Sequence, residues 1–232
     1  HCVPNGDFPH NPEPLNEHLG DLCEAVVSQN AHFGIAVDPD VDRLVFVDEK
    51  GHFFGEEYTL VACADYILSK TSGATVSNMS STRALLDVTL THAGHYSASA
   101  VGEVNVVKEM KAVNAVIGGE GNGGVIYPPL HYGRDALVGV VLFLSLLVER
   151  KVSVSKLRAS YPNYFMSKNK NILNEGIDVD DVMNTMAKRY VSEKISIIDG
   201  VKIDFEKEWV HLRKSNTESI IRVYTEAMSK EK

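Results

Sequence analysis

The sequence has no long apolar run, few cysteines and no excess of basic residues. Its longest apolar segment, residues 136–148, is interrupted by Gly139 and Ser145 and falls short of the roughly 20 residues that cross a bilayer. We therefore expect no membrane-spanning helix. The three cysteines lie far apart and form no CxxC pair, which indicates free thiols in a reducing, cytoplasmic compartment.

The chain also lacks the charge balance of a nucleic-acid-binding protein. Its formal net charge is −8, with 23 Lys and Arg against 31 Asp and Glu. Nucleic acids are bound through clustered Lys and Arg, so we expect no nucleic-acid partner. A small phosphorylated ligand stays possible, because it needs one positive pocket or a metal ion. The chain begins with His1 rather than Met, and we expect the natural N-terminus to lie upstream.

Helix-like and strand-like segments alternate through the first two thirds of the chain, which predicts α/β structure. Predicted strands occupy residues 33–37, 44–47, 74–79, 95–98 and 115–118. Predicted helices occupy residues 14–28, 56–70, 82–92, 103–111 and 133–150. The last helix is apolar over most of its surface, so we expect it to be buried.

Beyond about residue 161 the composition changes, and Asn and Lys become frequent. One helix is predicted there, at residues 178–192. Four short strands are predicted after it, at residues 195–198, 201–205, 209–212 and 220–224. This pattern is typical of a small, separate α+β domain. We expect three pieces, comprising residues 1–56, 57–160 and 161–232.

An acidic loop lies between the first two predicted strands. Its sequence, Asp38-Pro-Asp-Val-Asp-Arg43, places carboxylates at three alternate positions. Such groups repel one another unless their pKa values rise or a cation lies among them. Oxygen ligands on a short loop suit Mg²⁺ or Ca²⁺ and not Zn²⁺. A solvated acidic turn is the alternative interpretation.

The same loop invites comparison with an EF-hand. Four acidic residues match positions 1, 3, 5 and 12 of such a loop: Asp38, Asp40, Asp42 and Glu49. Position 6 requires glycine for a sharp turn, and Arg43 stands there. The flanking segments also read as strands rather than helices, so we reject the EF-hand.

A glycine-rich segment follows the predicted strand at 115–118. Gly119, Gly121 and Gly124 satisfy the G-x-G-x-x-G pattern of dinucleotide-binding sites. That pattern requires a helix to begin directly after the glycines, so that its N-terminal amides can bind the pyrophosphate. Residues 125–129 end in two prolines, which prevent a helix there. We therefore reject a dinucleotide site. Glu120 can accept protons from two sugar hydroxyls, while glycine lets backbone approach a ligand. A flexible turn with a solvated glutamate is the alternative.

A polar loop lies between the last two predicted strands. Its side chains include one guanidinium, two hydroxyls and an amide, from Arg213, Ser215, Thr217 and Asn216. Together with exposed backbone amides, these groups can bind an oxyanion. A polar hairpin turn is the alternative interpretation.

These three loops together resemble motifs of the α-D-phosphohexomutases. Residues 38–43 are similar to the Asp-Gly-Asp-x-Asp-Arg metal loop of that family. Residues 119–124 resemble its Gly-Glu-x-Ser-Gly-His sugar loop, and residues 213–219 its Arg-x-Ser-Gly/Asn-Thr-x-Pro phosphate loop. The departures from the three patterns are Pro39, Asn122, Gly124 and Ser219. The family's nucleophilic serine precedes His-Asn-Pro, but here Pro9 precedes those residues.

The resemblance implies a role for each matching residue. It implies Asp38, Asp40 and Asp42 as Mg²⁺ ligands and Arg43 as a catalytic residue beside the reacting groups. It implies sugar binding by Glu120 and Asn122. It implies phosphate binding by Arg213, Ser215, Asn216 and Thr217.

The fold implied is mixed-sheet α/β domains of the phosphohexomutase type followed by the small α+β domain. The activity implied is interconversion of hexose 1-phosphate and 6-phosphate through a bisphosphorylated intermediate, an intramolecular phosphotransfer of the isomerase class. We prefer glucosamine phosphate as substrate over mannose or glucose phosphate. Without the N-terminal domains that carry the phosphoserine, the chain alone should be inactive. The alternatives are a non-catalytic sugar-phosphate-binding module and a calcium-binding structural domain.

Overall fold

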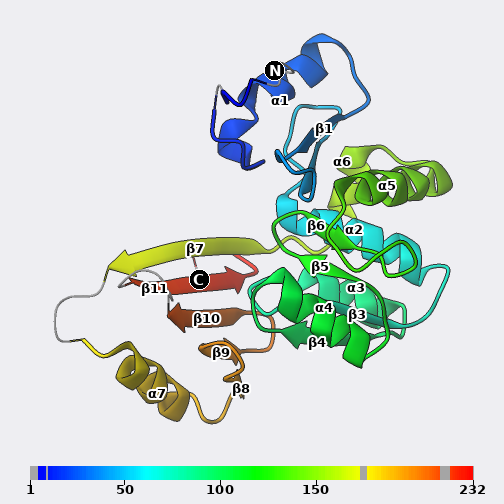
Figure 1. The fold of residues 1–232 in the computed structure, drawn as a ribbon. Coiled ribbons are helices and arrows are strands. Elements are labelled where there is room, and N and C mark those ends of the chain that lie inside the picture. Colours follow the sequence, from blue (N-terminus) through cyan, green and yellow to red (C-terminus); the bar gives the residue numbers. More distant parts are fainter. Residues whose placement is uncertain (1–4, 9, 173–176, 215–219, 232) are drawn as a thin grey trace.

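The computed structural model describes residues 5–8, 10–172, 177–214 and 220–231. It has three parts that follow one another along the chain, coloured from blue to red in Figure 1. The first part contains a short 3-10 helix η1 (Asn16–His18), helix α1 (Gly20–Ser28) and the strands β1 (Gly34–Val37) and β2 (Leu44–Val47). These two strands form an antiparallel pair, and the acidic loop connects them.

The central part is a four-stranded sheet with helices on both faces. Its strands, in spatial order, are β4 (His95–Ser99), β3 (Ala74–Asn78), β5 (Ala115–Glu120) and β6 (Gly124–Ile126). The first three strands are parallel, and β6 is antiparallel to β5. Strand β3 is buried along its whole length, as expected for a parallel strand that is covered on both faces.

Five helices surround this sheet. They are α2 (Glu56–Leu68), α3 (Ala84–Thr91), α4 (Glu103–Ala112), α5 (Ala136–Arg150) and α6 (Val154–Ala159). Helix α4 packs on one face through Val106 and Met110, which join Val76 in a small apolar cluster. Helices α2, α3 and α5 belong to the larger core cluster on the opposite face.

An aromatic cluster joins the first part of the chain to the central part. Phe46 of β2 stacks on Phe143 of α5 with ring centroids 3.7 Å apart, and Phe54 meets Phe143 edge-on at 5.1 Å. All three side chains are almost completely buried. Aromatic pairs of this kind add about 0.5–1.5 kcal/mol each beyond their area burial. The acidic loop is therefore anchored to the central sheet.

The third part is a five-stranded antiparallel sheet with one helix. Its strands, in spatial order, are β7 (Phe165–Ile172), β11 (Ile220–Ala227), β10 (Trp209–Lys214), β9 (Val201–Asp204) and β8 (Lys194–Ser196). Helix α7 (Val179–Arg189) packs on this sheet through Val179, which contacts Leu212 and Ile221. Figure 1 shows β7 beginning near the central part and running outward beside β11, as the edge strand of this sheet.

Most predicted elements are confirmed, and five differ. The helix expected over residues 14–28 begins at Gly20, because Leu15 is extended and only η1 forms before it. Helix α5 begins at Ala136 rather than 133, where the Asp135 side chain accepts a hydrogen bond from the Val138 amide (3.0 Å). Helix α6 and the strands β6 and β7 were not predicted, because α6 and β7 carry no clear apolar period and β6 has only three residues.

The prediction that the long apolar helix is buried is confirmed for one side of the helix and wrong for the other. Leu137, Val141 and Val148 of α5 are 67%, 61% and 76% exposed. One stripe of the helix packs on α2 and the sheet, while the other lies open. Within the part of the chain that the structure describes, no helix combines the length and apolar character needed to cross a membrane.

Candidate functional site

The acidic loop is held in place by its own backbone. The amide of Val41 donates to the Asp38 carbonyl (3.1 Å), and Asp38 Oδ1 accepts from the amides of Asp42 and Arg43 (3.0 Å each). Val41 adopts a left-handed conformation with φ of 58°, which is strained for a β-branched residue. The amide of Ala136 at the start of α5 donates to the Val41 carbonyl (3.1 Å) and supports this turn.

The three carboxylates of this loop converge on one another. Ligand oxygens of Asp38, Asp40 and Asp42 all lie within 4.8 Å of one another. Burial, together with the charges of Asp38 and Asp40, raises the pKa of Asp42 to about 6 despite the nearby guanidinium of Arg134. The pKa of Asp38 is lowered, because hydrogen bonds from the Arg43 and Asp42 amides outweigh its burial.

This donor set fits a hard divalent cation. Asp42 Oδ1 is buried and accepts no hydrogen bond within the described ranges. A cation among the three carboxylates would meet that oxygen and remove the repulsion that raises the pKa of Asp42. The flanking elements are strands β1 and β2, as predicted when the EF-hand was rejected.

Arg43 faces carboxylates of the chain itself. Its Nη1 lies 2.9 Å from Glu13 Oε1, and its Nε lies 3.4 Å from Asp38 Oδ2 and 3.8 Å from Asp42 Oδ1. The guanidinium therefore lies at the edge of the acidic loop. Its hydrogen-bonded partner is the Glu13 carboxylate.

The glycine-rich loop lies directly beside the acidic loop. It connects β5 to β6, and the Leu44 amide of β2 donates to the Gly123 carbonyl (3.1 Å). Gly123 has φ of 90°, and a Cβ there would lie 2.4 Å from the Leu44 carbonyl oxygen, so only glycine permits this approach. A strand follows the loop instead of a helix, which confirms that the dinucleotide pattern is accidental.

Glu120 is a buried carboxylate with a fixed orientation. It is 5% exposed, and its Oε1 accepts from Asn78 Nδ2 (2.9 Å) and from the Gly102 amide (3.2 Å). Its Oε2 accepts from Arg134 Nη1 (2.7 Å). The other predicted sugar contact, Asn122, folds back on its own loop, where its Oδ1 accepts from the Gly124 amide (3.2 Å).

Arg134 is the central residue that sequence reasoning missed. Its Nη2 donates to Asp42, its Nη1 to Glu120, and its Nε lies 3.5 Å from Glu103 Oε2. The backbone amide of Arg134 also donates to Glu103 Oε1 (2.8 Å). One guanidinium thus joins the acidic loop, the glycine-rich loop and the start of α4.

A signal for Arg134 was present in the sequence. A cation immediately before a helix N-terminus opposes the helix dipole, so its presence there indicates an acidic partner elsewhere. Arg134 stands just before the N-cap residue of α5. The neighbouring carboxylates raise its pKa even though its burial acts to lower it.

The polar loop of the third part is described only at its first two residues, Arg213 and Lys214. Arg213 Nε lies 2.8 Å from Asp199 Oδ2, and that same oxygen accepts from the Val101 amide (2.9 Å). The neighbouring Gly102 amide reaches Glu120. Arg213 is therefore connected to Glu120 of the glycine-rich loop through three residues, Asp199, Val101 and Gly102. The other predicted phosphate-binding residues, Ser215, Asn216 and Thr217, lie outside the described residues.

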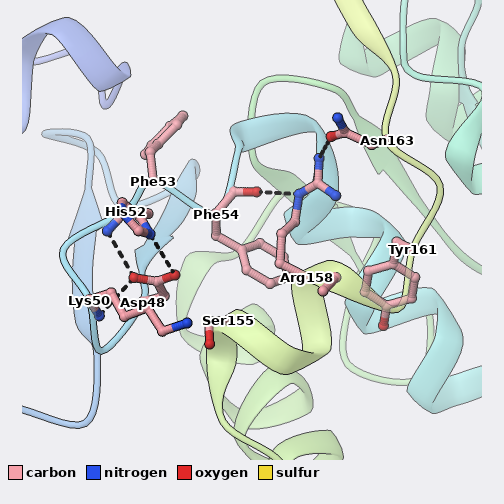
Figure 2. Close-up of a pocket in the computed structure, with 10 residues that line it drawn as sticks. Asp48, Lys50, His52, Phe53, Phe54, Ser155, Arg158, Tyr161 and Asn163 are labelled. Carbon is pink, nitrogen blue, oxygen red and sulfur yellow. Dashed lines mark hydrogen bonds and ion pairs between the residues drawn. The ribbon is translucent and has the colours of Figure 1, made fainter. Parts of the chain in front are cut away.

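Two hollows lie near these elements. One, of about 750 Å³, opens beside the acidic loop and includes Asp38 and Pro39 in its wall. The other, of about 440 Å³, lies where the connections before α2 and after α6 meet, and none of the predicted site residues lines it (Figure 2). Arg158 in its wall donates to the Phe54 carbonyl and to Asn163 (3.0 Å each), which ties the two connections together.

Comparison with family models matches the chain along nearly all of its length. Residues 1–51 match phosphoglucomutase/phosphomannomutase alpha/beta/alpha domain II, residues 55–164 match domain III, and residues 168–232 match the C-terminal domain.

Curated and solved relatives agree with these matches. The chain is 35% identical over 233 residues to a phosphoglucomutase/phosphomannomutase of Thermococcus kodakarensis, covering 99% of this chain and 51% of that relative. It is 32% identical over 221 residues to a phosphoglucosamine/phosphogalactosamine mutase of Sulfurisphaera tokodaii, covering 93% and 49%. A crystal structure of a phosphoglucomutase/phosphomannomutase family protein from Burkholderia thailandensis superposes with a TM-score of 0.82 at 26% identity, covering 98% and 50%. The chain therefore spans about half the length of the relatives it matches.

Proposed function

We propose a function from one premise: the chain belongs to the phosphoglucomutase/phosphomannomutase family, the α-D-phosphohexomutases. The longer protein would interconvert hexose 1-phosphate and hexose 6-phosphate through a bisphosphorylated intermediate. The observation that carries the proposal is Arg134, which contacts both Asp42 and Glu120. A metal loop and a sugar loop that share one side chain can act on one substrate.

In this proposal the chain supplies three of the binding elements. The parts at residues 1–56, 57–160 and 161–232 would carry the metal, sugar and phosphate loops respectively. The ends of the matched family models near residues 51–55 and 164–168 support these divisions. The phosphoserine would come from domains that precede this chain, so the chain alone would bind substrate without turnover.

The acidic loop would hold Mg²⁺ through Asp38, Asp40 and Asp42. When bound, the ion supplies charge neutralisation for a transferring phosphoryl group. Arg43 would add a guanidinium next to that group by exchanging its contact with Glu13 for a phosphate oxygen. Glu13 is 44% exposed at its side chain, so this ion pair contributes little and its loss costs little.

The glycine-rich loop would bind the sugar. Asn78 and Gly102 hold one oxygen of Glu120, which leaves Oε2 on the Arg134 side to accept sugar hydroxyls. Asn122 would add an amide nearby. Arg213, Ser215, Asn216 and Thr217 would hold the phosphate that is not being transferred.

We further propose glucosamine phosphate as the preferred substrate. Two carboxylates, Glu103 and Glu120, border one guanidinium in this region, which leaves local negative charge to receive a sugar ammonium group. A relative named phosphoglucosamine/phosphogalactosamine mutase supports this choice.

The test is an assay of the full-length protein with Mg²⁺ and a panel of glucosamine, mannose and glucose 1-phosphates. We expect the corresponding 6-phosphate to form, fastest from glucosamine 1-phosphate. Binding of these compounds without turnover of any would replace the mutase by a sugar-phosphate-binding module. A preference for Ca²⁺ with no response to sugar phosphates would favour a structural calcium site instead.

A further inference from the structure

The loop at residues 78–83, here called the junction loop, connects β3 to α3 beneath the glycine-rich loop. Residues 78–82 are all less than 9% exposed. Asn78 Nδ2 donates to Glu120 Oε1 (2.9 Å), and the Gly121 amide donates to Ser81 Oγ (2.9 Å). The orientation of Glu120 and the position of the next residue therefore depend on this loop.

Two buried glutamates hold the junction loop from opposite sides. The Thr82 amide donates to Glu57 Oε2 of α2, and the Arg83 amide donates to Glu226 Oε2 of β11 (2.8 Å each). These amides lie at the N-terminus of α3, where no carbonyl of that helix can accept from them. A carboxylate at this position satisfies the amide and also complements the helix dipole.

Glu57 also contacts the third part of the chain. Its Oε1 accepts from Lys168 Nζ of β7 (2.8 Å), whereas the neighbouring Glu56 lies at 3.5 Å from the same ammonium. Glu57 is 8% exposed, while the Lys168 side chain is 36% exposed. Burial raises the pKa of Glu57 to about 7, and Lys168 opposes that rise.

The glycine-rich loop rests directly on Glu57. A Cβ on Gly121 would lie 1.9 Å from Glu57 Oε2. The Gly121 backbone therefore lies directly against the carboxylate, with no side chain between them. Glu57 is thus a contact shared by the junction loop, the glycine-rich loop and β7. It links two segments of the sugar site to a strand whose sequence position is 111 residues away.

We infer that Glu57 and Lys168 form a positioning pair that sets the place of the glycine-rich loop, and with it the orientation of Glu120. This inference rests on the proposed function in taking Glu120 to bind the sugar. Without the Glu57 carboxylate, the Thr82 amide loses its acceptor and the space beneath Gly121 opens. Both changes let the junction loop and Glu120 move together.

The test compares Glu57→Ala with Glu56→Gln in the whole chain. The control removes the same charge one residue earlier, from a carboxylate that also faces Lys168 but is not hydrogen-bonded to Thr82. We measure amide hydrogen exchange at Gly121 and the dissociation constant for glucosamine 1-phosphate in Mg²⁺. Because Glu57→Ala removes a buried acceptor, we expect it to raise both the exchange rate at Gly121 and the dissociation constant about tenfold. In the control, both quantities should stay within about twofold of those of the unaltered chain.

A purely structural role would accelerate exchange everywhere, so amides of α4 serve as the internal reference. If Gly121 exchanges no faster than α4 or than in Glu56→Gln, the inference is overturned. If the unaltered chain binds no sugar phosphate but Gly121 still responds to Glu57→Ala, the positioning role stands and the proposed function fails. Should Glu57→Ala not fold, Lys168→Met removes the partner charge, and we expect faster exchange at Gly121 from it as well.

Discussion

Replacement of Arg134 by methionine should lower stability and strengthen metal binding at the same time. The side chain is 15% exposed and contacts Glu120 at 2.7 Å, Glu103 at 3.5 Å and also Asp42. Losing one partner of a buried ion pair costs about 3–5 kcal/mol. Glu120 keeps its bonds from Asn78 and Gly102, and the other two carboxylates reach water, so we expect a loss of about 2–3 kcal/mol.

The effect on Mg²⁺ has the opposite sign. Arg134 places a positive charge in contact with Asp42, one of the proposed ligands. A unit charge and a doubly charged ion about 5 Å apart repel by about 6 kcal/mol at an effective dielectric constant of about 20. If about a quarter of that repulsion is relieved, Mg²⁺ binds about tenfold more tightly to Arg134→Met.

The assay is calorimetric titration with Mg²⁺, together with urea unfolding in the presence of a chelator. Arg150→Met is the matched control, because Arg150 lies at the other end of α5 and pairs with the buried Asp65 at 2.7 Å. It should lose stability without a change in Mg²⁺ affinity. If Arg134→Met binds Mg²⁺ no more tightly than the unaltered chain, Arg134 does not act on the acidic loop as described.

Three other changes test the fold and the buried charges. Phe143→Ala removes the ring that stacks on Phe46 and should lower the free energy of unfolding by about 3–5 kcal/mol in urea titrations, while a loss below about 1 kcal/mol would contradict the packing. Asp135→Ala removes the N-cap bond to Val138 and should cost about 1 kcal/mol at pH 7. Burial acts to raise the pKa of Asp135, but its hydrogen bonds lower it on balance. The difference in the free energy of unfolding between Asp135→Ala and the unaltered chain should therefore shrink as the pH falls below about 4. A difference that does not depend on pH would refute the role of the Asp135 carboxylate as N-cap. Burial raises the pKa of Glu57 to about 7, so the stability that its protonated form contributes is present below the unfolded pKa and is lost as the pH rises towards 7. Glu57→Gln should remove this dependence of the free energy of unfolding on pH, measured at pH 5, 6 and 7. The same pH dependence in Glu57→Gln and in the unaltered chain would disprove the assignment.

Local patterns in the sequence determined the elements and two of the loops. Alternation of helix-like and strand-like segments predicted the parallel strands, because successive parallel strands need a crossover connection, usually a helix, between them. Carboxylates at alternate positions between two strands predicted the acidic loop, because their mutual repulsion is a property of that short segment alone. The prolines after the glycine-rich loop correctly excluded a helix there.

Only the tertiary structure decided which distant charges meet. Arg134 contacts Asp42 across 92 positions, and Glu57 contacts Lys168 across 111, and no periodic pattern in the sequence reports such pairs. The open stripe on α5 was missed for a related reason: the apolar period of a helix does not say whether another element covers each side. Sequence spacing fixes what a segment can form by itself, whereas packing brings separate segments together and so determines which carboxylates share a guanidinium or an ammonium group.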